Sequence, residues 1–180
     1  MLQLEIKPKE EWDENAQEFI YTKGQTLQLE HSLVSISKWE SKWCKPFLGK
    51  ESKTYEETID YIRCMTLTQN VNPKIYTMLS AENIMAVNNY IEAPMSATFL
   101  HESENKRPSR EAITSELIYY WMISYQIPFE CQKWHLNRLL MLIRVCSVKN
   151  TPVKKRSARD IMNQNAALNA ARRKQYNTKG

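Results

Sequence analysis

The chain has 180 residues, of which 42% are hydrophobic, and a formal net charge of +5. This length and composition indicate one domain with appendages and a core large enough to fold. The sequence contains neither a G-x-G-x-x-G nor a G-x-x-x-x-G-K-S/T pattern, which argues against nucleotide-dependent chemistry of those two kinds.

The N-terminal segment, residues 1–31, alternates in hydrophobicity, which predicts β-strands. Lys23 and Gly24 lie at the centre of the alternation, and glycine readily adopts the positive φ angle of a tight turn. We therefore expect a β-hairpin that turns at these two residues, with residues 2–6 as an added strand. The alternating side chains are Phe19, Tyr21, Leu27, Leu29 and His31.

Three helices are predicted next. The spacing of apolar residues becomes helical at Ser32, and this helix is expected to end before Pro46. A capping box, Thr54 with Glu57 three residues later, predicts the start of the second helix. The third is expected to open at Ser80. Residues 94–108 break the helical pattern and predict an exposed loop.

Two longer helices are predicted to follow this loop. The first covers residues 109–125, with Ser109 as N-cap, and ends before Pro128. The second covers residues 129–146, where apolar side chains such as Trp134 occur almost all round the helix. We expect the two to form an antiparallel pair at the centre of the core.

The last 32 residues, 149–180, differ from the rest in charge and are called the basic arm. They carry nine Lys or Arg residues and one acid, Asp160, a net charge of +8, so residues 1–148 total −3. Ser157 and Asp160 suggest a helix start, and residues 161–173 have helix-compatible spacing with a thin apolar stripe. A solvated surface helix would also explain this composition.

The predicted fold class is α+β and predominantly α-helical. An N-terminal β-hairpin, about residues 1–31, packs on a helical bundle, and a basic C-terminal helical arm follows. The predicted division is a mainly helical globular domain, residues 1–148, and the basic arm, residues 149–180.

Glu130, His135 and Arg138 bring acid, imidazole and guanidinium together in apolar surroundings. Glu130 and His135 could act as a general base pair. No nucleophile or oxyanion donor is visible nearby, so we favour a buried polar network that fixes helix packing.

We interpret Trp39 and Trp43 as core residues. Ser35, Ser37 and Ser41 are not part of a G-x-S-x-G motif, which surrounds the nucleophilic serine of many hydrolases. We interpret them as the polar face of their helix.

The four cysteines, at 44, 64, 131 and 146, form no C-x-x-C pair, and the three histidines are scattered. We expect reduced, mostly buried cysteines, no metal site and no cofactor. The first residues do not resemble a signal peptide, and no apolar run approaches the roughly 18 residues of a membrane span. We therefore expect a cytosolic chain without a membrane partner.

The basic arm is the candidate partner-binding segment. Its cations would bind either nucleic-acid phosphates or an acidic protein surface, and the sequence does not separate the two. Against nucleic acid, the arm has one aromatic residue, Tyr176, for base stacking. The candidate contact residues are Lys154, Lys155, Arg156, Arg159, Arg172, Arg173 and Lys174.

Several strings resemble proteins encoded by tailed bacteriophages and prophages, and the similarity covers nearly the full length. The most distinctive is Trp134-His135-Leu136-Asn137-Arg138. The others are Gln28-Leu29-Glu30-His31-Ser32-Leu33, Ser37-Lys38-Trp39-Glu40-Ser41-Lys42-Trp43, Ser115-Glu116-Leu117-Ile118-Tyr119-Tyr120-Trp121, Pro128-Phe129-Glu130-Cys131 and Asn169-Ala170-Ala171-Arg172-Arg173. Within that group, the chain resembles the tail assembly chaperones.

The resemblance implies a non-catalytic protein that binds the tape measure protein, the tail tube protein or both, in the host bacterial cytoplasm during assembly. It supplies no catalytic residues. A structural virion protein of the tail or neck is the first alternative, and a nucleic-acid-binding protein is the second. Self-association remains open, as does the existence of a frameshifted longer form.

Overall fold

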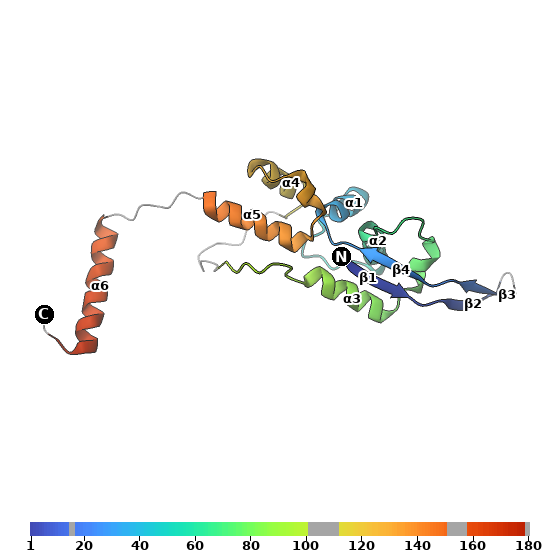
Figure 1. Cartoon of the computed structure of the whole chain (residues 1–180), viewed down its shortest axis with the longest axis horizontal. Coiled ribbons are helices and arrows are strands. Elements are labelled where there is room, and N and C mark those ends of the chain that lie inside the picture. Colours follow the sequence, from blue (N-terminus) through green and yellow to red (C-terminus); the bar gives the residue numbers. More distant parts are fainter. Residues whose placement is uncertain (15–16, 101–111, 151–157, 179–180) are drawn as a thin grey trace. The chain divides into compact units, whose positions relative to one another are not determined.

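The computed structural model describes residues 1–14, 17–100, 112–150 and 158–178. Its strands form one long, interrupted hairpin (Figure 1). The first and last strands, β1 (Leu2–Ile6) and β4 (Gln25–Leu29), pair antiparallel. The middle strands, β2 (Lys9–Asp13) and β3 (Glu18–Thr22), pair in the same way. The chain therefore reverses between β2 and β3, and the predicted turn at Lys23 and Gly24 is wrong.

Gly24 is needed at the interruption for a different reason. Its φ angle is not positive, but a Cβ atom there would lie 2.4 Å from the carbonyl oxygen of Ile6 and 2.7 Å from the nitrogen of Pro8. Pro8 has no N–H to donate across the hairpin. The two residues together explain why the ladder breaks here and resumes as β2 and β3.

The helices of the body begin largely where local capping signals predict. Capping boxes at Ser32, Thr54 and Ser80 start the first three α-helices, which confirms the three predicted starts. The helices are α1 (Leu33–Trp43), α2 (Tyr55–Met65), α3 (Ala81–Glu92), α4 (Ser115–Ser124) and α5 (Leu136–Asn150), with short 3-10 helices η1 (Pro73–Met78) and η2 (Phe129–Lys133). The α+β, predominantly helical fold class is therefore as predicted.

The two long helices predicted after the loop differ from expectation. Thr114, not Ser109, is the N-cap of α4, and residues 112–114 are not helical. Ser109 and most of the predicted loop lie outside the described residues. The helix predicted at 129–146 is divided into η2 and α5, because Trp134 is extended and His135 forms a β-bridge with Ser32. Instead of pairing with one long helix, α4 packs chiefly on α1.

The core lies between the β1–β4 ladder and the helices. Alternate residues of the ladder, such as Leu4 and Leu27, are buried, and β1 packs against α3. Trp39 of α1 is buried as predicted, with 2% of its surface exposed, whereas Trp134 is only partly buried. The largest fully buried side chains are Trp39, Leu27, Leu29, Leu33, Ile36, Ile62, Met65, Ile75, Ile118, Met122, Leu136 and Leu139.

Two expectations about small polar residues are corrected. All four cysteines are free, but only Cys131 is buried, and Cys44 is exposed at the left-handed C-cap of α1. Ser35 is not on a polar face, since it is buried and its hydroxyl donates to the carbonyl oxygen of Ser32 at 2.7 Å. A buried position is possible for this hydroxyl because the local backbone satisfies it.

The chain divides into two compact units, Met1–Ser147 and Val148–Gly180. The second unit contains α6 (Ala158–Tyr176), a helix of 19 residues. Every side chain of α6 whose exposure is described is exposed. This helix therefore has no apolar core of its own.

Candidate functional site

The predicted polar network of Glu130, His135 and Arg138 is wrong in its membership. His135 is buried, but Glu130 and Arg138 are exposed. The guanidinium of Arg138 instead lies 4.2 Å from the centre of the Trp134 ring, as in a cation–π contact. Because the segment is divided into η2 and α5, Glu130, His135 and Arg138 do not lie on one continuous helix. Helical spacing in the sequence therefore did not predict which of them is buried.

His135 belongs to a different buried group, which contains a second histidine. Its Nε2–H donates to the carbonyl oxygen of Tyr90 at 2.9 Å, and its Nδ1 accepts from the backbone N–H of Asn137 at 3.3 Å. These two bonds require the neutral tautomer with the proton on Nε2. The ring of His31 lies 5.1 Å from that of His135, and His31 Nδ1 is hydrogen-bonded to the Tyr61 hydroxyl at 2.5 Å.

Both histidines are held neutral by burial. Burial is the main cause that lowers the pKa of His31 to about 3, and the positive charge of Lys53 acts in the same direction. Burial also lowers the pKa of His135. Only 1% of His31 and 7% of His135 is exposed, so a substrate has no direct approach to either ring. We interpret this group as one that fixes packing, and the sequence missed it because its members come from separate elements.

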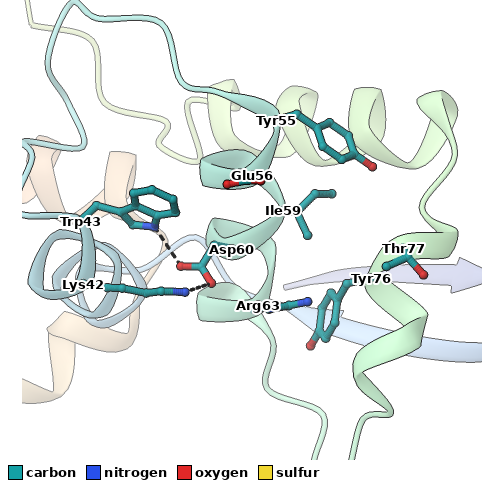
Figure 2. A pocket seen from close by; sticks show the side chains of 9 residues that line it. All are labelled: Lys42, Trp43, Tyr55, Glu56, Ile59, Asp60, Arg63, Tyr76 and Thr77. Atoms are coloured by element: carbon teal, nitrogen blue, oxygen red, sulfur yellow. Dashed lines mark hydrogen bonds and ion pairs between the residues drawn. The ribbon is translucent and has the colours of Figure 1, made fainter.

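A groove of about 400 Å³ lies between α2, the end of α1 and η1 (Figure 2). At its edge, Asp60 accepts from Lys42 at 2.5 Å and from the indole N–H of Trp43 at 3.0 Å. The guanidinium of Arg63 lies 5.1 Å from the centre of the Tyr76 ring. The Asp60 carboxylate is thus already paired. The aromatic walls make the groove better suited to binding a side chain of a partner than to catalysis. The lining residues are Lys42, Trp43, Tyr55, Glu56, Ile59, Asp60, Arg63, Tyr76 and Thr77.

The hairpin tip, residues 9–22, exposes large aromatic side chains. In the β2–β3 ladder Trp12 is opposite Phe19 and Glu10 is opposite Tyr21, so the four residues lie on one side, called the aromatic face. The Trp12 and Phe19 rings are 4.9 Å apart in an edge-to-face arrangement. Yet 52% of Trp12, 70% of Phe19 and 60% of Tyr21 is exposed. Figure 1 shows β2 and β3 projecting beyond the helices of their unit.

The hairpin tip also accounts for the acidity of the body. Residues 9–22 contain five acids and one lysine, a net charge of −4. Since residues 1–148 total −3, the rest of that region carries +1. Exposed clusters of aromatic residues are typical of protein-binding surfaces, and the acidic residues around this cluster favour a partner with basic residues. The alternation in the sequence predicted strands here but not which side chains are exposed.

The basic arm contributes a second exposed surface. Arg173 and Lys174 lie in the last turn of α6, where the helix dipole favours cations. Ile161, Leu168 and Arg172 are separated by close to whole helical turns and therefore share one side, called the helix face. Arg159 lies at the other end of α6. The remaining candidates, Lys154, Lys155 and Arg156, lie outside the described residues.

Within the described ranges, no group of three or more His, Cys, Asp or Glu side chains is placed to hold a metal ion. None of the helices described is both long and apolar enough to cross a membrane. Comparison of the chain with models of protein families, with curated proteins and with solved structures found no match.

Proposed function

We propose that this chain is a non-catalytic, protein-binding chaperone of phage tail assembly, which binds the tape measure protein, the tail tube protein or both. The observation that carries the proposal is the aromatic face, with Trp12, Phe19 and Tyr21 exposed on a hairpin outside the core. A two-stranded hairpin is marginally stable by itself, and aromatic residues are enriched at protein interfaces. Such a surface is costly to leave in water unless it has a partner.

The charges of the two surfaces favour a protein partner over a nucleic acid. The hairpin tip carries −4, so its aromatic residues stand in a field that repels phosphates. The basic arm attracts phosphates but offers only Tyr176 for base stacking. A protein with acidic and basic segments can match both surfaces, and the groove beside Trp43 provides space for an apolar side chain of such a partner.

The proposal is tested by co-expressing the tagged chain with the tape measure and tail tube proteins of the same phage. We expect wild-type chain to retain at least one of them, and Trp12→Ser/Phe19→Ser to lose it. Tyr120→Ser is the matched control, because Tyr120 is equally exposed but lies on α4. Retention of neither protein by the wild type contradicts the proposal.

Mass spectrometry of purified particles distinguishes the chaperone from a structural component. A chaperone is abundant in the infected lysate and absent from mature particles. A fixed copy number in particles would instead assign the chain to the tail or neck. In that case the basic arm would be an assembly contact inside the virion.

A further inference from the structure

We propose that copies of this chain associate head to tail, with the aromatic face of one copy bound to α6 of the next. The two surfaces have opposite charge: residues 9–22 carry −4, and α6 carries +3, from four cations, Arg159, Arg172, Arg173 and Lys174, against Asp160. Because one chain carries both surfaces, each copy supplies the binding partner of another. This inference does not depend on a role in tail assembly.

The two surfaces match in chemistry. The aromatic face combines three exposed rings with the carboxylate of Glu10. The helix face combines Ile161 and Leu168 with the guanidinium of Arg172. Ile161 and Leu168 can cover the aromatic rings, while Arg172 can pair with Glu10 or stack on a ring. Neither face buries these side chains within its own unit.

The two surfaces also match in length. The four residue steps of β2, from Lys9 to Asp13, extend about 13 Å at 3.3 Å per residue, and the 11 residue steps from Ile161 to Arg172 cover about 16 Å at 1.5 Å per residue. One helix can therefore lie along the whole hairpin tip. A helix on an exposed ribbon is a common way to cover sheet surfaces that would otherwise aggregate.

Both elements lack the packing that stabilises such structures elsewhere. Most of the stability of a protein helix comes from packing of its apolar face, and α6 includes three asparagines, which are poor helix formers. The hairpin tip is likewise a two-stranded ribbon, and the three rings of its aromatic face are exposed. Mutual contact would stabilise both.

Each chain carries the aromatic face in its Met1–Ser147 unit and α6 in its Val148–Gly180 unit. A copy bound through one surface therefore still offers its other surface to a further copy. Contacts of this heterologous kind continue from copy to copy and form rings or open filaments.

The test is sedimentation of the full-length chain and of two complementary variants. Trp12→Ser/Phe19→Ser removes two of the three rings of the aromatic face and leaves α6 intact. Arg172→Glu/Arg173→Glu changes the net charge of α6 from +3 to −1 and leaves the hairpin intact. Wild-type chain should form concentration-dependent oligomers that dissociate as the salt rises from about 0.1 M to about 1 M. Each variant alone should be monomeric, with association at least about tenfold weaker.

Mixing the two variants gives the decisive result. Each then contributes one intact surface, so the mixture should form a 1:1 dimer that cannot grow further. Tyr120→Ser and Lys74→Glu, both at exposed positions outside these surfaces, should associate like wild type. Glu10→Lys/Glu14→Lys provides a second hairpin variant that acts through charge alone and should also be monomeric.

Several outcomes would overturn the inference. One is a wild-type chain that stays monomeric at every concentration. Contact of α6 with the hairpin of its own chain would give this result too. Others are oligomers that persist in both variants and a variant mixture that fails to dimerise. Because the particle and co-expression experiments concern other proteins, failure here is distinguishable from failure of the proposed function.

Discussion

The imidazole rings of His31 and His135 lie with their centres 5.1 Å apart and their planes at 65°. His31 follows β4, and His135 immediately precedes α5. The contact is reinforced by the backbone, where the N–H of Leu136 donates to the carbonyl oxygen of His31 at 2.7 Å. Hydrogen bonds to Tyr61 and Tyr90 extend the group to α2 and α3. Two neutral imidazoles therefore connect four parts of the fold.

The His31 environment predicts loss of stability in mild acid. Unfolding returns the pKa of His31 from about 3 to its ordinary value of 6.5. Below pH 6.5 the unfolded chain binds a proton that the folded chain excludes, so the stability present above that pH is lost as the pH falls toward 3. Between pH 7 and pH 5 we expect His31 alone to lower the free energy of unfolding by about 2 kcal/mol.

Urea unfolding at these two pH values measures the effect, and His31→Gln is the comparison. The variant should be less stable at pH 7, because the contact with His135 is lost, but its stability should change less with pH. Equal pH dependence in both proteins would show that His31 is not the titrating group.

Glu40 predicts a second stability effect. Its buried carboxylate accepts from the backbone N–H of Phe47 and from that of Ser115, both at 2.7 Å, and so connects α1 to the start of α4. Glu40→Ala leaves two donors without their acceptor, which should lower the free energy of unfolding by about 2–4 kcal/mol. Chemical denaturation of this variant and of Glu56→Ala, an exposed position on α2, provides the measurement. Similar values for the two would contradict the structural role of Glu40.

The two tryptophans at 39 and 134 should differ in their effect on stability. Trp39 is 2% exposed, and its indole N–H donates to the carbonyl oxygen of Glu57 at 2.9 Å, so Trp39→Ala should cost about 3–5 kcal/mol. Trp134 is only partly buried, and Trp134→Ala should cost about 1–2 kcal/mol. Equilibrium unfolding compares the variants directly. The reverse order would mean that Trp134 is the more important core residue.

Removal of the basic arm should leave the body folded. A chain ending at Asn150 lacks all of the basic arm except Lys149 and Asn150, and it retains all of α5 and the whole Met1–Ser147 unit. We expect a cooperative thermal transition with Tm within about 4 °C of the full-length value, together with loss of partner capture. Calorimetry of the shortened chain checks the first expectation. A broad transition without cooperativity would show that residues 151–180 are needed for folding of the body.

Local sequence signals account for the parts of the fold that depend on neighbouring residues. A capping box needs only two side chains three positions apart, so Ser32, Thr54 and Ser80 mark their helix starts in any tertiary context. The charge difference between the basic arm and the rest is likewise a property of composition. For these features the sequence by itself was sufficient.

Tertiary contacts decided the features that sequence spacing predicted wrongly. The periodicity of residues 129–146 predicts one helix, but the bridge between Ser32 and His135 holds that segment extended and divides it. Gly24 suggests a turn, yet it is required because the backbone of Ile6 passes too close for a Cβ atom. In both cases the two contacting segments are distant along the chain. A local sequence pattern does not reveal that they lie close together in the folded protein. The same reason explains why the buried histidine pair and the exposed aromatic face could be located only in the folded chain.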